Sequence, residues 1–155
     1  MLKMEFSNLS ALSALVDKLA NEANQLANET AREIVKTSHS LARQRVADPS
    51  RKPGKGQGPY YRSIQSKIEF NGGAVTGRLF SDAPYAGVIE FGSRPHTIRA
   101  RNGKVLFLGG GRFANEVQHP GTPAFRVLEQ SAEKATAQAQ TILDRLFPKY
   151  FNRRS

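Results

Sequence analysis

Residues 8–46 read NLSALSALVDKLANEANQLANETAREIVKTSHSLARQRV, and this stretch decides the fold because it has the pattern of one long amphipathic helix. It contains neither Pro nor Gly. Its apolar or small residues recur every three or four positions, as one face of an α-helix requires. These residues are Leu12, Leu15, Val16, Leu19, Ala23, Leu26, Thr30, Ile34 and Leu41. The pattern predicts a helix over residues 8–46.

The length of this helix raises a question of fit. An unbroken helix here would measure roughly 58 Å, whereas a compact domain of this chain length is only about 40 Å across. Either the helix breaks, for which the weak helix formers Asn21, Asn24 and Asn28 mark a place, or it extends beyond the rest of the domain. In the second case its apolar face needs a second subunit to cover it. This is a first indication of an oligomer.

Charge is distributed unevenly along the chain. Residues 1–48 carry as many acidic as basic side chains, so the formal charge of +10 belongs to residues 49–155. Clustered Lys and Arg side chains create a field that attracts anions. The charge therefore favours phosphate-bearing or acidic partners, and the alternative is a solvated basic surface that maintains solubility.

The segment 48–59 combines three Pro, three Gly and three cations, Arg51, Lys52 and Lys55. Such a segment cannot bury apolar surface, so we predict a mobile basic loop. The adjoining residues Tyr60, Tyr61 and Arg62 place aromatic rings beside cations, a pattern typical of non-specific nucleic-acid binding. At least one of the two tyrosines should instead belong to the core, because they begin a predicted strand.

The middle of the chain has the pattern of short strands. Residues 60–70 and 74–80 flank Asn-Gly-Gly at 71–73, which predicts a hairpin. A second hairpin is predicted over 96–108, turning at Asn102-Gly103. Between them, residues 85–91 suit one or two helical turns ending at Gly92, although VIEF at 88–91 is equally compatible with a strand.

The last element is predicted to begin at Thr122-Pro123, since Thr is a good N-cap and Pro suits the first helical position. Its apolar seam consists of Leu128, Ala132, Ala135, Ala139, Ile142 and Leu146. Small side chains on a seam allow close helix packing, so this helix is expected to pack along the N-terminal one and to stop at Pro148.

These elements predict one α+β domain over residues 1–155, with a small antiparallel sheet of about four strands, a short helix, and a C-terminal helix packed on the long N-terminal one. Its parts are the N-terminal helix (1–47), the basic loop (48–59), the sheet region (60–121), the C-terminal helix (122–147) and a basic tail (148–155). No signal peptide or membrane span is apparent, so we expect a soluble protein made in a cytoplasm.

Catalytic patterns are sparse. The chain has no cysteine, which excludes disulfides and thiol chemistry. The histidines His39, His96 and His119 have no recognised metal-binding spacing to each other or to Glu90 and Glu116, and His119 in a His-Pro-Gly turn is assigned a structural role.

The glycines of 54–58 and 109–111 lack the continuation of a phosphate-binding loop and are predicted to be flexible loops. We therefore expect no enzyme, cofactor or metal. A small hydrolase or nuclease using His96, His119 and Glu90 is the minority hypothesis.

Two blocks of residues resemble a known family. APYAGVIEFGSRPH at 83–96, then VLF at 105–107 and HPGTPAF at 119–125, resemble the gene-product-ten-like minor tail component family of tailed phages and prophages. The matching motif residues are Pro84, Tyr85, Glu90, Gly92, His119, Pro120, Gly121 and Thr122. Ser93 stands where the family has Thr, and Ala124 separates the family's Pro-Phe pair. The resemblance covers about residues 60–147.

The resemblance implies a structural virion protein of the neck, a tail-completion or head-tail connector subunit that forms a ring, a hexamer, around the DNA channel. The implied partners are further copies of the chain, head-closure or adaptor proteins, tail terminator or tail tube proteins, and double-stranded DNA in the lumen. Its implied location is the virion, with assembly in the host cytoplasm.

Six cations are the predicted contacts to DNA or to an acidic neighbouring ring: Arg51, Lys52 and Lys55, then Arg99, Arg101 and Lys104. Electrostatic matching to an acidic protein, without DNA contact, is the rival explanation for these cations. A non-specific nucleic-acid-binding protein outside any virion is the alternative function.

Overall fold

The computed structural model describes residues 9–48, 58–71 and 74–151. The chain divides into two compact units. Unit 1 contains residues 1–41, 65–80 and 131–155, and unit 2 contains residues 42–64 and 81–130. The architecture is α+β, with a long N-terminal helix, small antiparallel sheets and C-terminal helices packed on the N-terminal one, as the sequence predicts.

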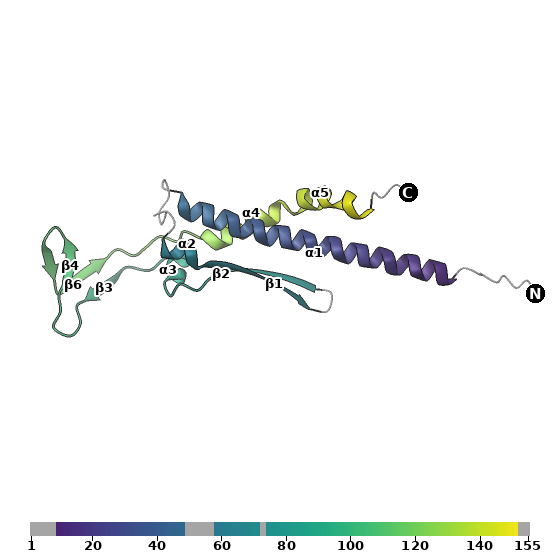
Figure 1. Ribbon diagram of the computed structural model, residues 1–155. Helices are drawn as coiled ribbons and strands as arrows, with labels where there is room; N and C mark the ends of the chain where they lie inside the picture. Colours follow the sequence, from purple (N-terminus) through teal and green to yellow (C-terminus); the bar gives the residue numbers. More distant parts are fainter. Residues whose placement is uncertain (1–8, 49–57, 72–73, 152–155) are drawn as a thin grey trace, which may run out of the picture. The chain divides into compact units, whose positions relative to one another are not determined.

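The N-terminal helix α1 spans Leu9–Ala47 as one unbroken helix of 39 residues (Figure 1). The predicted range is therefore confirmed to within one residue at each end. The three asparagines do not break it, because weak helix propensity costs well below 1 kcal/mol per residue and packing overrides it. Of the two outcomes considered for this helix, the break at the asparagines is thus excluded.

In unit 1 a strand pair lies against α1. β1 (Ile64–Asn71) pairs with β2 (Ala74–Ser81), which confirms the first predicted strand pair from Ile64 onward. A Cβ placed on Gly77 would lie 2.3 Å from Cγ2 of Val35, so glycine at this position allows β2 to approach the helix closely. The Arg32 guanidinium lies 4.9 Å from the centre of the Phe70 ring.

The C-terminal helices also pack on α1 in unit 1. α4 (Val127–Ala137) and α5 (Ala139–Phe151) are separated only at Gln138. The predicted seam faces inward, with Ala135 and Ile142 buried. Arg145 bonds Glu33 at 3.3 Å, and Nζ of Lys149 bonds both oxygens of Glu29 at 2.9 and 2.7 Å. The predicted packing of this segment along the N-terminal helix is confirmed.

Both predicted ends of the C-terminal helix are wrong. Thr122 and Pro123 lie outside any helix, and α4 begins at Val127. Pro148 lies inside α5, which continues to Phe151. Proline in the last turn removes one hydrogen bond. Two contacts stabilise this last turn. The rings of Phe147 and Phe151 stack with their centres 4.8 Å apart, and the hydroxyl of Tyr150 donates a hydrogen bond to Glu29.

Unit 2 contains two short helices in its core. α2 spans Pro59–Ser63 and α3 spans Ala86–Phe91. The predicted short helix before Gly92 is confirmed, but residues 60–63 form a helix instead of the predicted start of a strand. Proline at the first position of α2 is preset for a helix and gives up no hydrogen bond there. Tyr60 is buried, which confirms that one of the two tyrosines belongs to the core.

The remaining strands pair differently from the prediction. β3 (His96–Arg99) pairs antiparallel with β6 (Glu116–His119), and β4 (Leu106–Gly109) pairs with β5 (Arg112–Ala114). The predicted hairpin over 96–108 is therefore wrong. Asn102-Gly103 does form a turn, with positive φ at both residues, but the strands beside it pair elsewhere. We call residues 96–119 the arm. In Figure 1 the β4–β5 hairpin lies at the end of the β3–β6 pair.

No helix among the described residues has both the length and the apolar character needed to cross a membrane.

The close packing of α4 on α1 gives a stability prediction. Ala135 is fully buried on the seam, whereas Ala137 of the same helix is exposed. Ala135→Leu should lower the free energy of unfolding by about 1–3 kcal/mol, because three added carbons have no room. Ala137→Leu serves as the matched control and should change it by less than about 0.5 kcal/mol. Urea unfolding followed by circular dichroism measures both, and equal effects would contradict the packing.

Candidate functional site

The motif residues of unit 2 meet around Glu90. Its side chain is only 7% exposed, and Oε1 accepts a hydrogen bond from the hydroxyl of Tyr60 at 2.9 Å. The backbone N–H of Leu128 donates to Oε1 and Oε2 at 3.1 and 3.0 Å. Since Leu128 lies in the first turn of α4, Glu90 caps that helix from another element. This explains why α4 needs no N-cap at Thr122.

Tyr60 is the protonated partner in this arrangement. Burial raises the pKa of its hydroxyl well above the ordinary value of 10, and the hydrogen bond and the charge of Glu90 raise it further. The tyrosine therefore remains a hydrogen-bond donor to Glu90 at neutral pH. Its burial also contradicts the interpretation of Tyr60 as a ring for base stacking. The Tyr61 ring lies 5.0 Å from the Arg43 guanidinium, within the same unit.

A second group of motif residues joins the two ends of the arm. Ser93 and Thr122 exchange backbone hydrogen bonds of 2.9 and 3.1 Å. Gly92 and Gly121 flank this pair, with φ of 74° and 89°. A Cβ on Gly92 would lie 2.4 Å from the carbonyl oxygen of Thr122, and one on Gly121 would lie 2.4 Å from that of Ser93. Both positions therefore require glycine for conformation and for space.

The other motif residues lie around these two groups. Pro84 belongs to the turn before α3, where the N–H of Ala86 bonds the carbonyl of Ala83 at 2.9 Å. The Tyr85 ring centre is 6.3 Å from that of Tyr60. Nδ1 of His119 accepts a hydrogen bond from the N–H of Gly121 at 3.1 Å, across Pro120. The structure thus places all eight motif residues at or next to the base of the arm.

The predicted cations fall into two sets. Arg51, Lys52 and Lys55 lie outside the described residues. Arg99, Arg101 and Lys104 lie on the arm and are exposed. Arg99 forms an ion pair of 2.8 Å with Glu116 on the opposite strand, while Arg101 and Lys104 bracket the Asn102-Gly103 turn. The structure therefore brings the second set together on one element.

The histidines are placed as follows. His96 and His119 pair in register on β3 and β6, with ring centres 5.0 Å apart. Within the described part of the chain, no three His, Cys, Asp or Glu side chains gather as metal ligands would. Both oxygens of Glu90, the third residue of the hydrolase hypothesis, are occupied by Tyr60 and α4.

Sequence reasoning missed the apolar end of the arm. Phe107 and Phe113 are 65% and 62% exposed, with ring centres 5.3 Å apart, and Val105 and Leu108 beside them are also exposed. Residues 109–111 were predicted to be a flexible loop, but three successive glycines with positive φ close the tight β4–β5 turn. The sequence LFLGGGRF at 106–113 contains the pattern that indicates this apolar end. Large apolar residues flank a glycine turn on both sides, and no apolar strand that could belong to a core follows them.

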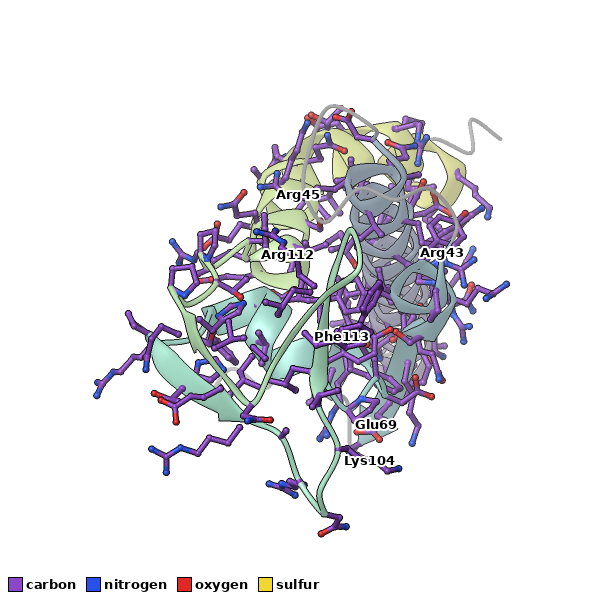
Figure 2. The ribbon with its side chains drawn as sticks, turned by 90° about the vertical axis from the view of Figure 1, so that its left-hand side faces the viewer. Arg43, Arg45, Glu69, Lys104, Arg112 and Phe113 are labelled. Atoms are coloured by element: carbon purple, nitrogen blue, oxygen red, sulfur yellow. The ribbon has the colours of Figure 1, made fainter. Side chains whose placement is uncertain are left out.

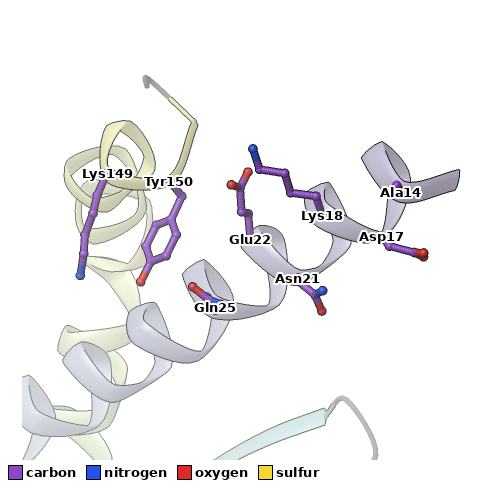
Figure 3. Close-up of a pocket in the computed structure, with 8 residues that line it drawn as sticks. All are labelled: Ala14, Asp17, Lys18, Asn21, Glu22, Gln25, Lys149 and Tyr150. Carbon is purple, nitrogen blue, oxygen red and sulfur yellow. The ribbon is translucent and has the colours of Figure 1, made fainter. Parts of the chain in front are cut away.

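A second exposed apolar surface lies in unit 1. Leu12, Leu15, Val16 and Leu19 share one side of α1 by their spacing, and they are between 44% and 57% exposed. We call these four residues the α1 face. On a different side of α1, this helix and the end of α5 enclose an open hollow of about 870 Å³ (Figure 3). Its lining is largely polar, with Asp17, Lys18 and Glu22 among its residues, so it does not extend the apolar surface.

Comparisons with protein-family models, with curated proteins and with solved structures each gave no match. The family resemblance thus stays a prediction.

The buried carboxylate gives a prediction for stability. Glu90→Ala leaves the hydroxyl of Tyr60 and the N–H of Leu128 without their acceptor, so it should lower the free energy of unfolding by about 2–4 kcal/mol. Glu129→Ala is the control, since Glu129 also lies in the first turn of α4 but is exposed and forms an ion pair with Arg126. It should cost less than about 1 kcal/mol. Equal losses in urea unfolding would show that Glu90 does not cap α4.

The raised pKa of Tyr60 gives a prediction for pH dependence. Above pH 10 an unfolded tyrosine loses its proton while the folded Tyr60 keeps it, so the folded state binds more protons and stability falls as pH rises. Tyr60→Phe removes this contribution. The free energy of unfolding should therefore decline more steeply between pH 9.5 and 11 in the natural chain than in the variant. Parallel curves would contradict the assignment.

Proposed function

We propose that this protein is a structural virion protein of a tailed phage or prophage, a ring-forming tail-completion or head-tail connector subunit that borders the DNA channel. Two kinds of observation support the proposal. The blocks 83–96 and 119–125 resemble the minor tail component family, and the chain presents two groups of exposed large apolar side chains, a feature typical of interaction surfaces.

The observation that carries the proposal is the exposed α1 face. Burying a fully exposed Leu or Val side chain stabilises by roughly 1.5–3 kcal/mol. Four side chains that begin about half exposed therefore offer on the order of 3–6 kcal/mol per subunit to whatever covers them. Leu26, on the same side of α1, is buried, so the α1 face continues an apolar stripe whose other part is already packed.

The charge distribution favours a second copy as the cover. Residues 1–48 carry no net charge, so two copies meeting through this segment gain apolar burial without electrostatic repulsion. The rest of the chain carries +10 and opposes self-contact. In the proposed ring, a hexamer, the neutral segment makes the subunit contacts and the basic residues face DNA or neighbouring rings of head-closure, adaptor, tail terminator or tail tube proteins.

The alternative function, a non-specific nucleic-acid-binding protein outside any virion, is favoured by the exposed cations Arg101, Lys104 and Arg112. The two functions differ in particle context. The proposed subunit should be found in purified virions, as a ring between capsid and tail in electron micrographs, whereas the alternative gives a monomer that binds duplex DNA with a steep salt dependence.

Self-association through the α1 face can be tested directly. Leu15→Glu places a charge within the face, and we expect it to shift the chain from oligomer to monomer in sedimentation velocity at a concentration where the natural chain assembles. Ala14→Glu adds the same charge to the adjacent residue, which lies off the face and lines the hollow of Figure 3. This control should assemble normally. A monomeric natural chain, or equal loss in both variants, would count against the proposed ring contact.

A further inference from the structure

The arm is hydrogen-bonded at its base and along the β3–β6 pair. The Ser93–Thr122 pair and its two glycines join the strands at the base. The β3–β6 ladder follows with four successive residue pairs, and the N–H of Ala100 bonds the carbonyl of Asn115 at 2.8 Å. Thr97 Oγ1 also bonds Gln118 Oε1 at 2.9 Å. An element ordered in this way loses little further entropy when it binds.

Exposed aromatic residues lie at the end of this ordered arm. Phe107 and Phe113 contact each other but remain nearly two-thirds exposed. A two-stranded hairpin is too small to bury them in a core of its own. Large aromatic side chains are the residues that dominate binding energy when they enter a pocket on a partner.

The surroundings of these phenylalanines are strongly basic. Residues 96–119 contain four Arg or Lys side chains and a single acidic one, Glu116, which is paired with Arg99. Lys104, Arg112 and Phe113 come from this arm, and Figure 2 labels all three. The arm therefore combines exposed cations with exposed aromatic side chains.

We infer that the end of the arm is a docking surface for an acidic protein with an apolar pocket, in which Phe107 and Phe113 are the anchors and Arg101, Lys104 and Arg112 the surrounding charges. This deepens the proposed function and rests on it in one respect, namely that the occupant is a neighbouring structural protein.

Charge and shape favour this occupant over the others. A second copy is disfavoured, because the chain carries +10 and five of its acidic side chains, Glu29, Glu33, Glu69, Glu116 and Glu129, are paired internally. Duplex DNA matches the cations but offers no apolar pocket to two phenylalanines, since its bases are stacked. Single strands can stack on aromatic rings, but Val105 and Leu108 have no counterpart on a base.

The test measures fluorescence anisotropy of four labelled probes with the full chain. They are an acidic peptide containing Leu and Phe, a polyglutamate peptide of equal charge, a 20-nucleotide single strand and its duplex. We expect the acidic apolar peptide to bind about tenfold more tightly than polyglutamate, and Phe107→Ser/Phe113→Ser to abolish that advantage. The charge variant Arg101→Gln/Lys104→Gln/Arg112→Gln should weaken both peptides.

Phe91→Ser is the matched control, because Phe91 is 82% exposed but lies on α3, outside the arm. It should leave peptide binding unchanged. If the double serine variant does not fold, as judged by circular dichroism, the single variant Phe113→Ser replaces it, with an expected loss of about threefold.

Several results would overturn the inference. These are no peptide binding, equal binding of the two peptides, insensitivity to the phenylalanine substitutions, or tighter Phe-dependent binding of either nucleic acid. Assembly and peptide binding are measured separately, so this inference and the proposed function can fail independently. Leu15→Glu, which alters only the α1 face, should still bind the acidic apolar peptide. Peptide binding that persists while the natural chain fails to assemble overturns only the proposed ring, whereas assembly without peptide binding overturns only the docking surface.

Discussion

Unit 2 depends on the hydrogen bonds that the buried carboxylate of Glu90 accepts. A carboxylate out of water is costly unless its oxygens are bonded, and here the hydroxyl of Tyr60 and the N–H of Leu128 supply those bonds. The same group thereby fixes α2, α3 and the start of α4 to one another. Because these bonds hold Tyr60 and the first turn of α4, the position of Glu90 in the motif is explained by architecture.

The base of the arm follows from the same local construction. α3 ends at Phe91, directly after the capping residue Glu90, and Gly92 leads into the Ser93–Thr122 pair. The return strand β6 ends at His119, and after Gly121 the backbone hydrogen bonds of Phe125 and Arg126 to Ile89 and Glu90 lead into α4. Motif residues that lie far apart in sequence thus serve one purpose, which is to anchor an exposed element on a small core.

Sequence patterns succeeded where the cause was local. The period of apolar residues located α1 to within one residue, and Gly92 marked the end of α3. They failed where the deciding partner was distant. Asn102-Gly103 forms its turn, yet β3 pairs with β6 across the intervening β4–β5 hairpin, which no turn signal specifies. The start of α4 depends on a carboxylate 38 residues earlier, so the stronger local signal at Thr122-Pro123 misled.

The two exposed surfaces differ in the interactions they can make with a partner. This difference matters for the proposed assembly. The α1 face is apolar in a segment without net charge, so contacts there depend on burial and respond little to salt. The arm end combines aromatic residues with exposed positive charge, so contacts there weaken as ionic strength rises. Under the proposal, a second copy would cover the α1 face, whereas like charge would repel it at the arm end. In the proposed assembly, the subunit would associate with further copies through the α1 face, and the arm end would stay available for a partner of opposite charge.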